Sequence, residues 1–213
     1  MYRRFFKRIL DLILSITGFI ILLPIFLIIT FLVRLLIGKP VFFEQERTTI
    51  KKRKFNIIKF RTMTNEKDEK GTLLTDDKRI TKFGCFLRTT SLDELPELIN
   101  IIKGEMSFIG PRPLPSLYLD YYKEEELPRF EVRGGLIPPD SIDKNAIISW
   151  DKQFEYEKKY SMNVSFLSDV KILISVFRII FQRNKTYYGS YVRQPLNIER
   201  KDIIGKRKKY VSD

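Results

Sequence analysis

Three carboxylates, Asp93, Glu94 and Glu97, lie close together in the stretch SLDELPEL at 91–98. Two adjacent carboxylates at a helix start can hold a hard divalent cation such as Mg²⁺, which prefers oxygen ligands and bridges to substrate phosphates. A carboxylate can also attack phosphorus directly and form an acyl phosphate. The stretch therefore indicates phosphoryl chemistry, with Asp93 and Glu94 as candidate catalytic and metal-binding residues.

The same stretch has a purely structural interpretation. Ser91 and Glu94 have the spacing of a capping box, and Asp93 would then lie in the first turn, where a negative charge complements the helix dipole. With Ser91 as the cap, Pro96 would clash with the carbonyl four residues earlier, whereas with Asp93 as the cap it falls in the tolerated first turn. Both caps stay open, and Glu97 is predicted to be only a polar position on a helix.

Composition narrows the chemistry that the chain can perform. The 213 residues include 39 Lys and Arg against 26 Asp and Glu, a formal net charge of +13. This balance favours phosphate-bearing partners, such as nucleic acid, an anionic membrane or phosphorylated small molecules. With no histidine and one cysteine, the chain has no His-based nucleophile pair, intrachain disulfide or Cys-rich zinc site. Cys85 itself is expected to be a small buried apolar residue.

Three cations are candidates for binding a phosphate. Arg112 lies in GPRP, where the flanking prolines fix its backbone, and its guanidinium suits a phosphate bidentately. Lys59 and Arg61 lie on an expected strand and could add positive charge. Each of these residues, taken singly, could instead be a solvated surface cation. The motifs GxxxxGK[ST] and GxGxxG are absent, so P-loop and Rossmann phosphate binding are not supported.

A long uncharged stretch precedes these residues, from Leu12 to Val33. As a helix it would be roughly 33 Å long, enough to cross the hydrocarbon core of a bilayer. Both flanks of this stretch are basic, so the positive-inside rule predicts that both are cytoplasmic. The basic residues before the stretch are Arg3, Arg4, Lys7 and Arg8, and those after it are Arg34, Lys39, Arg47 and 51–54. A single transmembrane helix could satisfy only one flank. Because Pro24 can bend the helix, we predict a re-entrant membrane helix over 1–38.

The other segments predict an α+β protein that is mainly helical. Their β-branched and aromatic content predicts a small β-hairpin from 40–47 and 54–63. Apolar spacing predicts helices over 79–90, 92–102, 118–132, 148–161 and 165–183. Gly104 supplies the stop for the second of these helices. The expectations for the connecting segments are a surface loop or short helix at 64–79, a short extended run at 106–113 and an irregular segment at 133–141.

Two C-terminal helices and the tail have features of membrane association. The helix at 148–161 is amphipathic, and the one at 165–183 is apolar almost all round, which is typical of a buried helix or one lying in the membrane interface. The tail at 200–209 is basic, is expected to be mobile, and is a candidate for binding anionic lipid. The expected organisation is a membrane hairpin at 1–38, a domain carrying the candidate site at 39–190, and a basic tail at 191–213.

The order of several motifs resembles a known family. After the basic and apolar segment with its proline come KFRTM, SLDELPEL, KGEMSFIGPRP and SFLSDVKIL. Together they resemble the bacterial sugar transferases, monotopic phosphoglycosyl transferases that begin glycan assembly on a lipid carrier. The resemblance extends roughly over 1–132 and 145–182. It implies Mg²⁺-dependent transfer of sugar-1-phosphate from a UDP-sugar to polyprenyl (undecaprenyl) phosphate, with release of UMP, at the cytoplasmic face of the bacterial inner membrane, in exopolysaccharide or lipopolysaccharide synthesis.

The resemblance also implies roles for individual residues. Asp93 would be the nucleophile that takes up the phosphosugar, and Glu94 would help it to hold Mg²⁺. Arg112 would bind phosphate. Lys59 and Asp169 match further polar positions of the family's site. The full set of candidate substrate-binding residues is Lys59, Arg61, Arg112, Arg133 and Asp169.

One segment departs from the family pattern. Similar proteins carry a stretch like RPGITGWAQVNGR, where this chain has RGGLIPPDSIDKN at 133–145. Arg133 and Gly135 are kept, but Gly134 replaces proline, the tryptophan and glutamine are missing, and Asn145 replaces the final arginine. In the membrane segment, Leu23 replaces the usual serine before the proline. We therefore hypothesise an unusual donor, a different nucleotide or an inactive relative.

Two further classes of function are compared with the enzyme. A non-catalytic membrane scaffold descended from such an enzyme would account for the altered segment at 133–145. A basic membrane-bound nucleic-acid binder would account only for the net charge, and the long apolar run and the lack of a binding motif argue against it. The expected partners are thus a nucleotide sugar, polyprenyl phosphate and an anionic membrane, with no nucleic acid.

Overall fold

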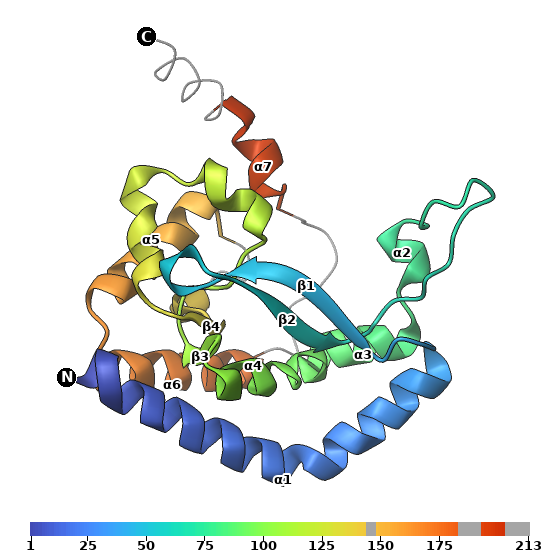
Figure 1. The fold of residues 1–213 in the computed structure, drawn as a ribbon, viewed down its shortest axis with the longest axis horizontal. Coiled ribbons are helices and arrows are strands. Elements are labelled where there is room, and N and C mark those ends of the chain that lie inside the picture. Colours follow the sequence, from blue (N-terminus) through green and yellow to red (C-terminus); the bar gives the residue numbers. More distant parts are fainter. Residues whose placement is uncertain (144–147, 183–192, 203–213) are drawn as a thin grey trace. The chain divides into compact units, whose positions relative to one another are not determined.

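The computed structural model describes residues 1–143, 148–182 and 193–202, which form two compact units. The N-terminal unit consists of Asp11–Gln45 and Asn56–Gly104. The C-terminal unit consists of Met1–Leu10, Glu46–Phe55 and Glu105–Asp213. Helices predominate, and two small sheets accompany them (Figure 1). The prediction of a mainly helical α+β protein is confirmed.

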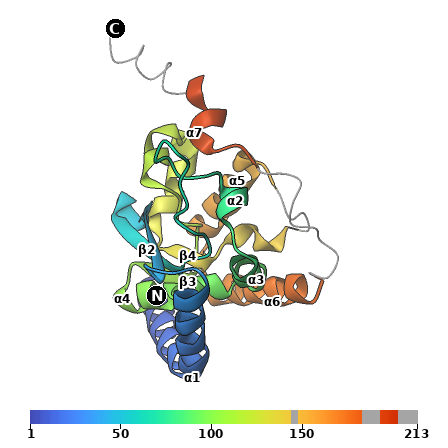
Figure 2. The ribbon, with the colours of Figure 1, turned by 90° about the vertical axis from the view of Figure 1, so that its right-hand side faces the viewer.

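The long helix α1 (Lys7–Leu36) follows a π-helical turn at Tyr2–Phe6 and contains Pro24. Figure 1 shows α1 bent near its middle, and in Figure 2 its two arms nearly overlap. In the second arm, Ile29 and Val33 enter the core of the N-terminal unit. The helix is long and apolar enough to cross a membrane, and little of its most apolar stretch is buried. Its re-entrant course stays a prediction.

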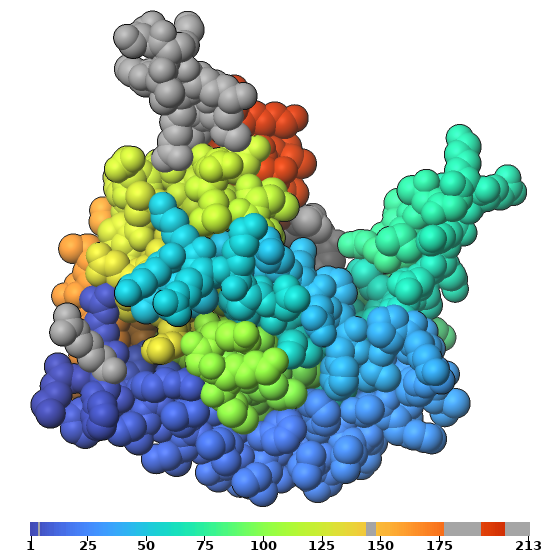
Figure 3. All heavy atoms as spheres, viewed as in Figure 1, coloured from blue at the N-terminus to red at the C-terminus, as the bar shows by residue number. Residues whose placement is uncertain are grey.

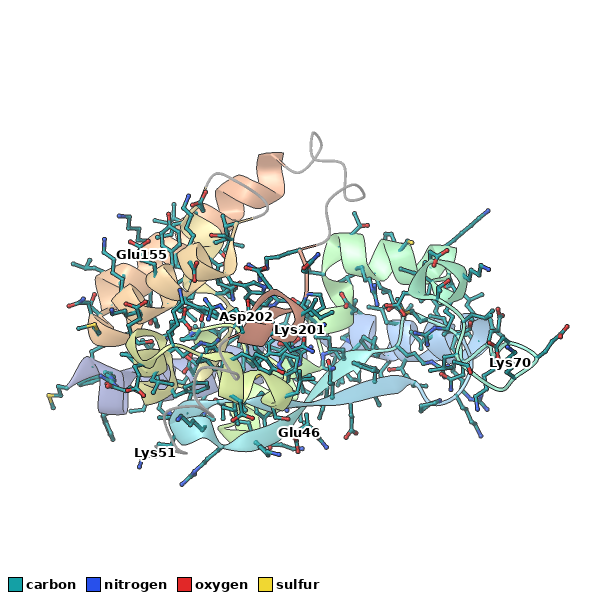
Figure 4. The ribbon with its side chains drawn as sticks, turned by 90° about the horizontal axis from the view of Figure 1, so that it is seen from above. Glu46, Lys51, Lys70, Glu155, Lys201 and Asp202 are labelled. Carbon is teal, nitrogen blue, oxygen red and sulfur yellow. The ribbon has the colours of Figure 1, made fainter. Side chains whose placement is uncertain are left out.

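The predicted β-hairpin is confirmed as strands β1 (Phe42–Thr48) and β2 (Lys54–Phe60). A 3-10 turn at Ile50–Lys52 joins them, and Lys51 and Lys52 have positive φ angles of 55° and 58°. Such angles are uncommon for residues with a Cβ. Lys51 lies at this turn and points outward (Figure 4).

Loop 64–75 stands out from the N-terminal unit as an arm (Figure 3), and Lys70 lies at its far end (Figure 4). Two short helices follow it, α2 (Asp76–Arg79) and α3 (Lys82–Thr90). A 3-10 turn at Leu92–Glu94 then leads to α4 (Glu97–Lys103), which ends at Gly104 with φ 86°, as predicted. Cys85 on α3 is exposed, so the prediction that it is buried was wrong.

The C-terminal unit contains a parallel pair of strands, β3 (Met106–Ile109) and β4 (Gly134–Ile137). The prediction of an irregular segment at 133–141 was therefore wrong for its first half. Gly110 and Gly135 make the pairing possible, since a Cβ on Gly135 would lie 2.1 Å from the Gly110 nitrogen. Between the strands, the expected helix at 118–132 is split into two 3-10 helices, Ser116–Tyr121 and Glu124–Glu131, the second of which contains Pro128.

Two predicted helices complete this unit, α5 (Trp150–Met162) and α6 (Phe166–Gln182). On helix α5, Trp150 and Phe154 enter an aromatic core, whereas Glu155 points away from it (Figure 4). Tyr160 of α5 and Ile172 of α6 pack with Ile109 next to the parallel strands.

The described part of the expected basic tail folds back onto the C-terminal unit. A short helix, α7 (Leu196–Glu199), buries Leu196 fully in the aromatic core. Arg200 is also buried, and it pairs with Glu126 at 2.8 Å. Residues 191–192 and 203–213 of the expected tail, like Asn145, lie outside the described residues.

Candidate active site

The candidate carboxylates lie in the tight connection between α3 and α4. Ser91 ends α3 in the left-handed conformation (φ 57°), and its side chain makes no capping hydrogen bond. Pro96, not Asp93, occupies the N-cap position of α4. Both capping predictions were therefore wrong. The backbone turns sharply instead, and the carboxylates of Asp93 and Glu94 are not used to cap a helix.

Lys59 on β2 is the cation of this site. Its Nζ lies 2.7 Å from Glu94 Oε1 and 3.0 Å from Glu97 Oε1. The three side chains are 18%, 23% and 3% exposed respectively, so water screens these pairs only partly. The prediction that Glu97 is only a polar helix position was wrong. The sequence did contain a signal for this role of Glu97. Glu97 follows Glu94 by three residues, a spacing that can bring two side chains to the same side of a helical segment.

Asp93 is partly buried beside this ion-pair cluster. Burial raises the pKa of its carboxyl group above the usual value, and repulsion from Glu94 adds to this effect. Attraction to Lys59 and Arg88 opposes it. Arg88 on α3 is anchored by a hydrogen bond from its Nε to Thr62 Oγ1 at 3.0 Å. No sequence motif had indicated that Arg88 belongs to this site. An approaching cation would therefore stabilise the ionised form of Asp93.

The donor set fits Mg²⁺ only together with a phosphate-bearing substrate. Within the described residues, no three acidic, histidine or cysteine side chains are grouped so as to hold a metal ion. Asp93 and Glu94 offer adjacent carboxylates, although one oxygen of Glu94 is paired with Lys59. Mg²⁺ is commonly bound by one or two carboxylates together with substrate phosphates and water, which is compatible with this pair.

Arg61 belongs to the same unit but has structural contacts. It is 6% exposed, and its Nε donates to the Met63 carbonyl at 2.7 Å. Its Nη1 donates to the Lys39 carbonyl. These bonds join the end of β2 to the segment that follows α1. A role of Arg61 in substrate binding stays a prediction.

Arg112 and Arg133 belong to the C-terminal unit, near the close approach of Gly110 and Gly135. A Cβ on Gly110 would lie 2.3 Å from the Arg133 carbonyl oxygen, so the backbones of the two segments touch there. Arg112 follows Gly110 by two residues, and its side chain is exposed. Arg133 is half-buried.

Asp169 on α6 is a buried acceptor with three donors. Its Oδ2 accepts hydrogen bonds from Lys7 Nζ and from Tyr2 OH, both at 2.7 Å. Its Oδ1 accepts from Tyr160 OH, also at 2.7 Å. These bonds tie the first residues of the chain to α5 and α6. A role in substrate binding stays a prediction.

The structure thus sorts the predicted site residues into two sets. Asp93, Glu94 and Lys59 form one cluster in the N-terminal unit, with Glu97 and Arg88 added to it. The C-terminal unit carries Arg112, Arg133 and Asp169.

The sequence profile of the bacterial sugar transferases matches residues 2–183. The chain belongs to the bacterial sugar transferase family. It is 44% identical over 172 residues to "Uncharacterized sugar transferase EpsL" of Bacillus subtilis, an alignment that covers 81% of this chain and 85% of the relative. It is 33% identical over 191 residues to "Exopolysaccharide production protein ExoY" of Sinorhizobium fredii, covering 82% and 83% of the two chains.

A longer relative carries a more explicit name. The "UDP-glucose:undecaprenyl-phosphate glucose-1-phosphate transferase" of Klebsiella pneumoniae is 35% identical over 184 residues, which are 81% of this chain but 40% of the relative. The chain therefore spans less than half the length of that relative.

Proposed function

We propose that this protein is a phosphoglycosyl transferase that moves sugar-1-phosphate from a UDP-sugar to polyprenyl phosphate and so begins the assembly of a glycan or exopolysaccharide. The observation that carries the proposal is the cluster of Asp93, Glu94 and Lys59 in a member of the sugar transferase family. The names of two relatives, one a UDP-glucose:undecaprenyl-phosphate glucose-1-phosphate transferase and one an exopolysaccharide production protein, support the substrate classes and the pathway.

The proposed reaction has two displacements at one phosphorus atom. An oxygen of the Asp93 carboxylate attacks the phosphorus next to the sugar, and the bond from that phosphorus to the bridging oxygen breaks. UMP leaves with the electron pair of that bond, and Asp93 carries the phosphosugar as an acyl phosphate. A phosphate oxygen of the polyprenyl phosphate then attacks the same phosphorus. The bond to Asp93 breaks, which restores the carboxylate and yields a polyprenyl diphosphosugar.

The neighbouring residues support this chemistry by charge and position. Lys59 fixes Glu94 through the 2.7 Å ion pair, so that Glu94 presents its carboxylate in a constant orientation beside Asp93. Asp93 and Glu94 would hold Mg²⁺, which when bound neutralises phosphate charge and stabilises the leaving UMP. We assign Arg112 to phosphate binding, because an exposed guanidinium can donate two hydrogen bonds to one phosphate.

We also propose that α1 enters and leaves the membrane on one side, the cytoplasmic face of the bacterial inner membrane. The bend near the middle of α1, the Pro24 within it and the basic residues on both flanks support this course (Figure 1). The net charge of +13 further favours an anionic membrane surface. Accessibility labelling of cysteines placed singly at positions 3 and 39, in a Cys85→Ser background that removes the exposed native cysteine, tests it. Labelling from the cytoplasmic side at both positions is expected, and labelling from opposite sides would refute the re-entrant course.

A second candidate is a relative that uses a different donor or has lost activity. The segment at 133–143 favours it, because it lacks the aromatic and amide side chains of the family pattern and carries Pro139 and Asp140 instead. This candidate predicts that no UDP-sugar is a good substrate, although the N-terminal unit keeps its carboxylate cluster.

One assay separates the two candidates. Membranes containing the protein are incubated with UDP-sugars, polyprenyl phosphate and Mg²⁺, and UMP release is measured for the wild type and for Asp93→Asn. Release by the wild type alone supports the enzyme. Equal release by both proteins would exclude Asp93 as the nucleophile. Absence of release with every UDP-sugar, followed by turnover of another nucleotide sugar, would identify a changed donor, and absence of all turnover would indicate a non-catalytic relative.

A further inference from the structure

The main chain of Arg112 is held on both sides by buried charges. Its N–H donates to Glu157 Oε1 at 3.0 Å, and its carbonyl accepts a hydrogen bond from Arg129 Nη2 at 2.6 Å. The two holding residues pair with each other at 2.7 Å, and their side chains are 2% and 0% exposed for Arg129 and Glu157. The residue that they hold presents its own side chain to solvent.

Further hydrogen bonds fix the orientation of this pair. Glu157 Oε1 also accepts from Gln153 Nε2 at 2.9 Å, and Gln153 Oε1 accepts from Arg193 Nη2 at 2.7 Å. Arg129 Nη1 donates to the hydroxyl of the fully buried Tyr122. The pair is thus bonded to Gln153 on α5 and to the segment between the two 3-10 helices, and through Gln153 it is linked to the segment before α7. Neither side chain can rotate without breaking several hydrogen bonds.

Stability alone is a poor reason for this arrangement. The cost of removing two charges from water can exceed their mutual attraction, so a buried ion pair often adds little to stability. Here the pair also holds both main-chain polar groups of one exposed residue. Pro111 and Pro113 on either side are buried and have restricted φ angles. These six hydrogen bonds and the two proline rings therefore determine the direction in which the Arg112 side chain leaves the backbone.

We propose that Glu157 and Arg129 are positioning residues that fix Arg112 for binding a phosphate of the substrate; this inference rests on the proposed function for the role of that phosphate. A guanidinium binds a phosphate bidentately only when its plane and direction are right. A misplacement of about 1 Å can cost on the order of 100-fold in rate. The buried pair supplies this precision without touching the substrate.

The chain offers a matched control for the positioning pair. Arg200 and Glu126 form a second buried ion pair in the C-terminal unit, at 2.8 Å with side chains 7% and 6% exposed. Arg200 also donates to a main-chain carbonyl, that of Tyr121, at 3.1 Å. This pair has no contact with Arg112 among the described hydrogen bonds. It therefore reports the general effect of disturbing a buried ion pair in this unit.

The first measurement follows hydrogen exchange of the Arg112 amide in the purified full-length protein. Glu157→Gln weakens the acceptor of this amide, and exchange is expected to rise about 10-fold or more. A 10-fold rise corresponds to a loss of about 1.4 kcal/mol in the free energy of opening. Glu126→Gln should leave the exchange rate of the Arg112 amide within about 2-fold of the wild type, because Glu126 does not accept from this amide. An unchanged rate in Glu157→Gln, or an equal rise in both variants, would overturn the positioning role.

The second measurement is a double-mutant cycle on UMP release. Glu157→Gln is expected to lower kcat/KM about 10- to 100-fold in the wild-type background and less than about 2-fold in an Arg112→Ala background. Glu126→Gln should have the same small effect in both backgrounds. If Glu157→Gln costs the same factor with and without the Arg112 side chain, it acts only on the fold, and the proposal is wrong.

A milder variant covers the case in which Glu157→Gln does not fold. Arg129→Lys keeps the charge that compensates Glu157 but cannot reach both that carboxylate and the Arg112 carbonyl. It should reproduce the loss and its dependence on Arg112, whereas Arg200→Lys should not. Absence of UMP release by the wild type would overturn the proposed function, and amide exchange would then decide alone whether the pair holds Arg112.

Discussion

Asp140→Asn should stabilise the protein at neutral pH. Asp140 lies in the 3-10 helix at Pro139–Ile142, and its Oδ1 is enclosed with no hydrogen-bond partner among the described residues. Burial, with a further contribution from Glu157, raises the pKa of Asp140 from 3.8 to about 6, although Arg112 and Arg193 act in the opposite direction. At neutral pH the folded protein therefore carries a carboxylate whose charge is poorly compensated.

The direction in which stability changes with pH follows from proton binding to Asp140 in the folded and unfolded states. Between pH 3.8 and about 6 the folded Asp140 holds its proton while the unfolded one has lost it, so stability falls as pH rises through this window. A difference of about two pH units corresponds to about 3 kcal/mol at most when both states are ionised. Asn has the same shape and no charge. The gain from Asp140→Asn should grow by about 2 kcal/mol between about pH 4.5 and pH 7.

The assay is thermal unfolding of the detergent-solubilised protein across this pH range. Each kcal/mol should shift Tm by roughly 2–4 °C for a chain of this size. Asp151→Asn is the control of opposite sign, because hydrogen bonding to Lys123 lowers the pKa of Asp151 and its ionised form favours the folded state. A Tm difference between wild type and Asp140→Asn that does not change with pH would refute the reasoning.

Three further predictions, two of them with a control substitution, test other parts of the structure. Leu196→Ala should cost about 2–5 kcal/mol in the free energy of unfolding, since the side chain is fully buried, while Ile198→Ala on the exposed face of α7 should change it by less than about 0.5 kcal/mol. Gly135→Ala should lower Tm sharply because its Cβ would meet backbone at 2.1 Å, whereas Gly18→Ala, with no atom within 4 Å, should be neutral or slightly stabilising. Lys59→Met should reduce UMP release at least about 10-fold, because the buried Glu97 and the partly buried Glu94 lose their shared cation, and unchanged release would contradict its role.

Elements with a strong local signal could be predicted from the sequence. The hairpin of β1 and β2, the helix α5 and the stop of α4 at Gly104 all followed from residue pattern or from a glycine that tolerates positive φ. The strand β4 could not be predicted in this way. Its sequence is short and contains two glycines, and it becomes a strand only because the glycine contacts let β3 approach it.

In the candidate site, too, residues with a local sequence signal could be predicted, whereas those that depend on distant contacts could not. Asp93 and Glu94 were predicted as site residues from their residue type, and the ion pair with Glu94 places Lys59 beside them. The capping interpretation failed because Pro96 makes a separate start for α4, and the chain turns sharply before it. Glu157 could not be found, since nothing in an amphipathic helix distinguishes a buried glutamate that holds a distant main chain from one that faces water.

The central claim is that Asp93 itself carries the phosphosugar. Mass spectrometry of the purified protein tests it most directly, after mixing with Mg²⁺ and UDP-glucose or UDP-galactose without polyprenyl phosphate and quenching in acid. We expect UMP release and an added hexose phosphate on the peptide that contains Asp93, with neither in Asp93→Asn. An adduct on another residue, the same adduct in the variant, or UMP release by the wild type with no adduct would contradict it.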